Sequence, residues 1–205
     1  MSTDNTIGGE HIPSQQVGEQ MDVVEKRSFD DEVTAIEFFQ VAKKRLLDVN
    51  NWASLAGNEL SSFQLTNSFG NLVERFAQES DYLKIDIPGP GTSAGQGYDW
   101  VLVEAIIEEK EVGMEAIVLT VRPSANPLSN NIDTAHFLTE QATSTFQVKR
   151  IGKTIYAEEH GRNEQANTYT SSTVDNMRNM FVGWAASLGL SYPQWKQLVR
   201  GLLED

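Results

Sequence analysis

The chain has 205 residues, of which 40% are hydrophobic, enough for the core of one domain. Its 29 acidic residues outnumber 16 basic ones, and the net charge of −13 disfavours nucleic acid and anionic membrane surfaces as partners. The absence of cysteine excludes disulfides, thiolate metal ligands and cysteine nucleophiles. No signal-peptide pattern or spanning apolar run is evident, so we expect a cytoplasmic protein without membrane insertion.

Residues 1–27 are polar, with isolated apolar residues and no periodicity, which predicts a disordered acidic tail. Met21-Asp22-Val23-Val24-Glu25 could instead serve as a first strand. Residues 28–205 are predicted to form a single domain.

The first helix is predicted from Asp31 to Val49, with Ser28 and Asp31 at capping-box spacing. Asn50-Asn51 ends it, and Trp52 is expected to anchor the helix end in the core. The predicted buried stripe consists of Val33, Ile36, Phe39, Ala42 and Leu46.

Six strand-like runs follow in the middle of the chain. They are 62–66, 83–87, 100–107, 116–121, 145–151 and 154–158. Gly152-Lys153 between the last two is typical of a type II′ hairpin turn. The run 69–77 fits either a hairpin turning at Gly70-Asn71 or a short helix.

Two helices are predicted at the end of the chain. Ser172 and Asp175 have capping spacing, and Gly189 ends the first helix. Ser191 caps the second helix, with Pro193 in its first turn. The first stripe consists of Val174, Met177, Phe181, Trp184 and Leu188, and the second of Trp195, Leu198, Val199, Leu202 and Leu203.

Short links between the strands favour antiparallel pairing, because parallel pairing needs long crossovers. The predicted fold is therefore α+β: a curved, mostly antiparallel sheet of about six strands, packed against an N-terminal helix and two C-terminal helices.

The loop from Ile87 to Trp100 holds four glycines and two prolines. It matches neither a dinucleotide fingerprint nor a Walker loop, and a strand follows it, so it is not predicted to bind phosphate. It could form a structural corner or a lid, and the flexible Gly95-Gln96-Gly97 favours the lid.

The best polar candidates for ligand contact are Arg122 and Arg162, since arginine near apolar surface needs a partner such as a carboxylate. His136 and His160 could act in acid–base chemistry together with Asp99. No nucleophile elbow or H-E-x-x-H spacing occurs, so we predict no catalytic residue, no metal and no cofactor.

The order of elements resembles the START-like helix-grip superfamily, also called SRPBCC or polyketide-cyclase-like. The resemblance covers residues 29–205: a helix ending in Asp48-Val49-Asn50-Asn51-Trp52, strands from Phe63 to Glu158, and a closing helix from Thr173. It implies a curved antiparallel sheet that wraps a C-terminal helix and leaves an apolar cavity.

The leading hypothesis is that the protein binds a small apolar or amphipathic ligand between the sheet and the helix 173–188. The candidate ligand-binding residues are Trp100, Arg122, His136, Phe146, Arg162 and Trp184. The alternatives are an enzyme of the cyclase, dehydratase or hydrolase type, a protein-interaction module, and a small flavin-binding barrel. A homodimer is compatible with the sequence.

Overall fold

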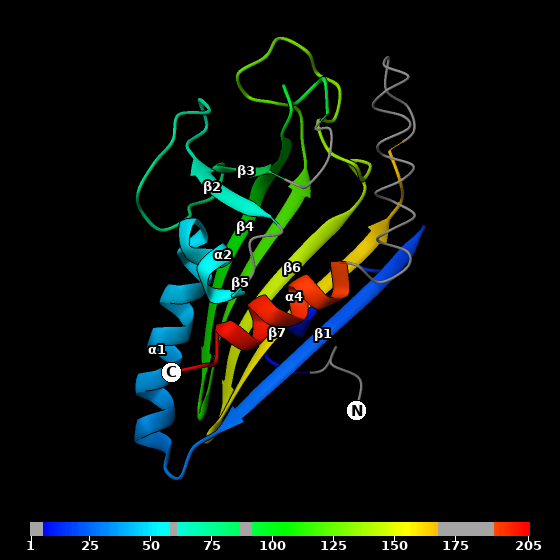
Figure 1. Ribbon diagram of the computed structural model, residues 1–205. Coiled ribbons are helices and arrows are strands. Elements are labelled where there is room, and N and C mark those ends of the chain that lie inside the picture. The colour runs from blue at the N-terminus through cyan, green and yellow to red at the C-terminus, as the bar shows by residue number, and fades with distance from the viewer. Residues whose placement is uncertain (1–5, 58–60, 87–91, 168–190) are drawn as a thin grey trace.

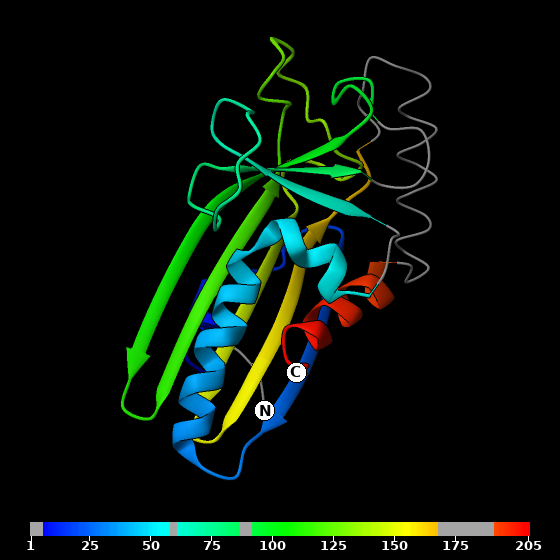
Figure 2. The same ribbon diagram turned by 60° about the vertical axis from the view of Figure 1, so that its left-hand side comes forward.

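The computed structural model describes residues 6–57, 61–86, 92–167 and 191–205. Its centre is a seven-stranded antiparallel sheet with the strand order β1-β7-β6-β5-β4-β3-β2 (Figure 1). Helices α1 (Glu32–Leu47), α2 (Trp52–Leu55) and α4 (Ser191–Gly201) lie on one face of this curved sheet (Figure 2). The α+β fold class predicted from the sequence is confirmed. The predicted helix 173–188 lies outside the described residues.

Six strands correspond to the six predicted runs. They are β2 (Ser62–Thr66), β3 (Tyr82–Asp86), β4 (Asp99–Glu111), β5 (Met114–Pro123), β6 (Thr143–Ile151) and β7 (Thr154–Glu164). Gly152 has φ 57 between the paired residues Ile151 and Thr154, as the predicted two-residue hairpin requires. Strands β4 and β5 extend further than predicted, because their polar ends pair beyond the apolar run.

The seventh strand corrects the expectation of a disordered tail. Strand β1 (Glu19–Ser28) pairs with β7 along the sheet edge, and the short helix η2 (Gly9–His11) precedes it. Only Val23 of β1 is buried, because an edge strand keeps much of its surface in water. That exposure explains why this stretch reads as a polar tail in the sequence.

Helix α1 (Glu32–Leu47) begins at Asp31, whose side chain accepts a hydrogen bond from Thr34 N. The N-cap is therefore Asp31 itself, and the helix ends two residues before the predicted Val49. Its buried residues are Ala35, Phe39, Ala42 and Leu46. The predicted stripe was wrong at its first two positions: Val33 and Ile36 are 66% and 40% exposed, because the buried face runs through Ala35 instead.

Short helices continue the chain after α1: η3 (Val49–Asn51) and α2 (Trp52–Leu55). Asn50 closes the free edge of β2, since its side chain accepts from Leu65 N and donates to Val73 O. Val73 N also donates to Leu65 O, and Thr66 and Leu72 form a single bridge. With Asn67 N donating to Asn71 O, the segment forms a short version of the predicted hairpin, with its turn over 67–71 instead of at Gly70-Asn71, and not the alternative helix.

Helix α4 (Ser191–Gly201) packs against β1, β7 and α2. Leu198, Val199, Leu202 and Leu203 are buried and Trp195 is partly buried, which confirms the predicted second stripe. Among the described residues, no helix is both long and apolar enough to cross a membrane.

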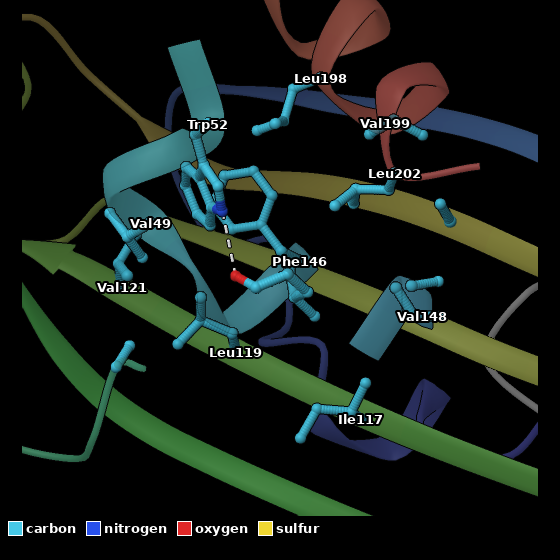
Figure 3. Packing of buried hydrophobic residues seen from close by; sticks show 14 of the residues in the cluster. Val49, Trp52, Ile117, Leu119, Val121, Phe146, Val148, Leu198, Val199 and Leu202 are labelled. Carbon is cyan, nitrogen blue, oxygen red and sulfur yellow. Dashed lines mark hydrogen bonds between the residues drawn. The ribbon is translucent and has the colours of Figure 1, made fainter. Parts of the chain in front are cut away.

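Trp52 and Phe146 pack among aliphatic side chains between the sheet and the helices (Figure 3). Trp52 is 1% exposed, and its indole Nε1 donates to Leu46 O. Its ring centroid lies 4.8 Å from that of Phe146, which also contacts Trp195 at 5.2 Å. The predicted anchoring role of Trp52 is confirmed.

Candidate functional site

Strand β7 places a glutamate on the face of the sheet that packs against the helices, here called the helix face. Ile155 and Ala157 of β7 lie in the core, and alternation places Glu159 on the same side. Glu159 pairs with Phe146 of β6 and with Val23 of β1, both of which are core residues. A carboxyl group therefore lies among apolar side chains, directly opposite Phe146 of the aromatic cluster.

Glu159 is 0% exposed, and among residues 6–57, 61–86, 92–167 and 191–205 neither of its carboxyl oxygens has a partner with hydrogen-bond geometry. Burial raises the pKa of Glu159 well above its ordinary value, and the charges of Glu164 and Asp22 raise it further. Arg162 and Ser144 oppose the rise. Buried polar groups are normally hydrogen-bonded, so an unpartnered buried carboxyl is the feature of this molecule that most needs an explanation.

A second carboxyl lies beside the first. A Cβ placed on Gly161 would lie 2.8 Å from Glu164 Oε1, so the Glu164 side chain folds back over this glycine. Asn163 between them has φ 57, a left-handed conformation that redirects the chain. Burial, followed by the charge of Glu19, raises the pKa of Glu164 to about 7. Glu159 and Glu164 together form the carboxyl pair.

The opposite, outer face of the same strands carries a chain of buried ionic contacts. Lys149 Nζ lies 2.7 Å from Glu158 Oε2, and His160 Nε2 lies 2.9 Å from the same oxygen. His160 Nδ1 lies 2.5 Å from Asp22 Oδ1, which also accepts from Arg162 at 2.7 Å. Lys149, His160 and Arg162 each contact a carboxylate.

These contacts also lower the pKa values of Glu158 and Asp22. Burial raises the pKa of Glu158, but His160 and Lys149 outweigh it, so the net shift is downward. Asp22 follows the same pattern, with His160 and Arg162 lowering its pKa against burial. Both acids are thus held ionised, and the outer face is a paired structural network.

Residues 6–17 cross this outer face behind the sheet (Figure 2). Gln147 Nε2 donates to Gly8 O, and Asn163 Oδ1 accepts from Gln16 N and Val17 N. His11 Nε2 lies 2.7 Å from Glu109, and this hydrogen bond is the main cause of the lowered pKa of Glu109. Polar contacts, which leave no periodic sequence signal, hold this segment.

The same segment brings together possible metal-ligating atoms. One ligand atom each from Glu10, His11 and Glu109 lies within 4.8 Å of the others. Glu109 already accepts from both His11 and Gly8 N, which is the arrangement of a structural tether.

Of the residues predicted to bind a ligand, only Phe146 lies on the helix face of the described structure. Arg122 forms three hydrogen bonds to the Glu104 carboxylate, and Arg162 is bonded to Asp22 and to two backbone carbonyls. Trp100 is buried and donates from Nε1 to Gly95 O. Trp184 lies outside the described residues.

The three groups considered for acid–base chemistry are all buried. His136 Nδ1 accepts from Leu138 N, and its ring stacks on Phe137. Asp99 lies near it in the fold, since Trp100 N donates to Ala135 O. His160 belongs to the outer-face network.

The described half of the glycine-rich loop is a closed turn around Thr92. Thr92 Oγ1 donates to Tyr98 O and accepts from Gly95 N, while Gly97 N donates to Thr92 O. A Cβ on Gly95 would lie 1.8 Å from Tyr98 O, whereas nothing lies within 4 Å of one on Gly97. These contacts favour the corner over the expected lid. Residues 87–91 lie outside the described part.

Gly95→Ala is therefore expected to destabilise the protein by about 1–3 kcal/mol, because the turn has no room for a methyl group. Gly97→Ala, with φ 94 but open space, should cost about 1 kcal/mol from backbone strain alone. Urea denaturation of both variants measures the difference. Equal, small losses would speak for a mobile lid.

The hollows on the described surface include two that are lined by neither Glu159 nor Glu164. One of about 660 Å³ is lined by residues of η3, β2 and 72–76. The other, of about 400 Å³, lies between residues 13–17 and the strand ends near Arg122, Thr143 and Asn163. Apolar side chains are exposed beside the first hollow, notably Leu72 and Phe76.

No family model and no curated protein matches the chain. Solved structures similar to it include a hypothetical protein from Helicobacter pylori, at 9% identity and TM-score 0.49, covering 98% of this chain and 93% of that one. Major latex-like protein 151 from Panax ginseng is 8% identical at TM-score 0.36, covering 84% and 97%. Ara h 8.0201 is 11% identical at TM-score 0.36, covering 91% and 100%. Likenesses of this size support no family assignment, and the START-like resemblance stays a prediction.

Proposed function

We propose that the protein binds a small apolar or amphipathic molecule on the helix face of its sheet, beside Glu159. The observation that carries this proposal is Glu159, a fully buried carboxyl group whose two oxygens have no partner with hydrogen-bond geometry in the part of the chain that the structure describes. A ligand that supplied a polar partner would relieve the cost of burying this group. Phe146 and Val23 beside it offer apolar surface for the rest of the ligand.

The aromatic side chains between the sheet and the helices limit where a ligand can lie. Trp52, Phe146 and Trp195 contact one another between the sheet and the helices and fill the space around them. The ligand would therefore lie next to this cluster, beside Ser144, Glu159 and Gly161. A few polar groups set in an apolar wall are the usual composition of small-molecule sites.

Thermal unfolding in the presence of single-chain amphiphiles, together with native mass spectrometry of the purified protein, tests this proposal. A ligand at 100 times its Kd should stabilise the protein by about 2.7 kcal/mol, and the unfolding midpoint should rise. Ser144→Phe, which adds bulk beside Glu159, should abolish the rise, and Ser144→Ala should keep it. The proposal fails if no compound shifts the midpoint and only the bare chain is detected, or if Ser144→Phe binds like the native protein.

A further inference from the structure

More negative than positive charges act on the carboxyl pair. Among the described residues, the charges that act on Glu159 are those of Glu164 and Asp22, which disfavour its ionisation, and that of Arg162, which favours it. Glu164 is influenced in the same way by Glu19 and Arg162. Carboxylates thus outnumber the single positive group.

Arg162 already donates hydrogen bonds to other groups. The guanidinium of Arg162 donates to Asp22 Oδ1 at 2.7 Å and to the backbone oxygens of Met21 and Gly161, at 3.1 and 2.8 Å. It compensates Asp22, which belongs to the outer-face network. The apolar neighbours of Glu159 on β6 and β1, Phe146 and Val23, bring no charge of their own.

We propose that the ligand of this site is a cationic amphiphile, an organic amine whose ammonium group lies against Glu159 and Glu164. This inference rests on the proposed function and specifies its ligand class. Charged donors form the strongest hydrogen bonds with carboxylates, and two carboxylates facing one side match the donors of an ammonium group. The apolar part of the amine would lie on the helix face.

Binding is then coupled to proton release. In the free protein burial raises the pKa of Glu159, which favours the protonated form of its carboxyl group. The incoming ammonium ion favours the carboxylate, and the proton leaves the carboxyl oxygen for the buffer. The amine keeps its own proton, so binding the cation releases protons from the carboxyl pair and forms no covalent bond with the ligand.

The test compares three probes with the same chain: decylamine, decanol and decanoate at submillimolar concentration. Isothermal titration calorimetry at pH 6.5, in phosphate and in Tris buffer, gives affinities and the number of protons released. Decylamine should bind at least about tenfold more tightly than decanol and release protons, and decanoate should bind weakest. Glu159→Gln should remove the preference and lower the number of protons released, because only Glu164, with its pKa of about 7, can then release a proton.

Glu111→Gln is the matched control, because Glu111 is exposed at the far end of β4. It should bind decylamine like the native protein, which excludes general attraction to the acidic surface. If decanol binds as tightly as decylamine, the ligand class is wrong and the proposed function stands. If none of the three probes binds, both the ligand class and the proposed function are wrong. If Glu159→Gln still prefers decylamine, the inference that Glu159 receives the amine is overturned.

Discussion

Glu159→Gln is expected to raise the free energy of unfolding at pH 7.5 and to flatten its dependence on pH. The folded-state pKa of Glu159 lies well above its ordinary value of 4.5, because the carboxyl group is fully buried. As the pH rises above about 4.5, the unfolded chain loses this proton while the folded protein keeps it. The stability of the native protein therefore falls until the folded-state pKa is passed. Glutamine is neutral in both states and removes this fall.

Glu164 also makes the stability of the native protein fall as the pH rises. Its pKa of about 7 in the folded protein corresponds to a loss of about 3 kcal/mol between pH 4.5 and 7, at about 1.4 kcal/mol per unit. Urea denaturation from pH 5 to 8 measures Glu159→Gln and Glu164→Gln against the native protein, with Glu111→Gln as the control. Glu111→Gln shows the effect of removing an exposed carboxylate, so a larger change in the other two profiles belongs to the carboxyl pair. Parallel profiles for Glu159→Gln and the native protein would contradict the assignment.

Lys149→Met is expected to destabilise the protein by about 3–5 kcal/mol, because it leaves a buried carboxylate short of a partner. Lys149 and Glu158 are 1% and 2% exposed, and their charged atoms lie 2.7 Å apart. With Lys149 removed, Glu158 retains only its contact with His160. The double variant Lys149→Met/Glu158→Gln should recover part of the loss.

Lys110→Met is the matched control for this prediction. Lys110 lies 2.8 Å from Glu115, nearly the same separation, but its side chain is 79% exposed. Exposed ion pairs contribute at most about 1 kcal/mol, so the loss should be small. Chemical denaturation of the four variants measures both effects. Equal losses at Lys149 and Lys110 would mean that burial does not set the strength of the outer-face network.

The sequence predicted the elements whose side chains repeat with a clear period. The strands of the sheet centre, the Gly152-Lys153 turn and the stripe of α4 all follow from apolar spacing. Strand β1 was predicted as part of a tail, because an edge strand with one buried valine has little apolar signal. Residues 6–17 are held by polar and backbone contacts with distant strands, which no local pattern encodes.

The candidate site was harder to predict, because its central residue looks like an ordinary strand-end acid. Glu158 and Glu159 are adjacent and chemically identical, yet one belongs to an ionic network and the other to the helix face. The one available signal was the alternation of side chains along a strand. Glu159 lies two and four residues after the apolar Ala157 and Ile155, which places all three on the same face. Arg122 and Arg162 were chosen for their charge, and their carboxylate partners are visible only in three dimensions.

The pairing of β1 with β7 also constrains how the chain can fold. Ser28 and Thr154 lie opposite each other although 126 residues separate them, so the sheet edge closes only after almost all of the chain is available. Pairings of such long range form slowly. During synthesis, residues 19–28 therefore leave the ribosome long before their partner strand β7 is made, and they stay unpaired with it until then. Folding from the N-terminus is thereby excluded for this edge, and the hairpins β4–β5 and β6–β7, which need only local turns, are the natural first structures.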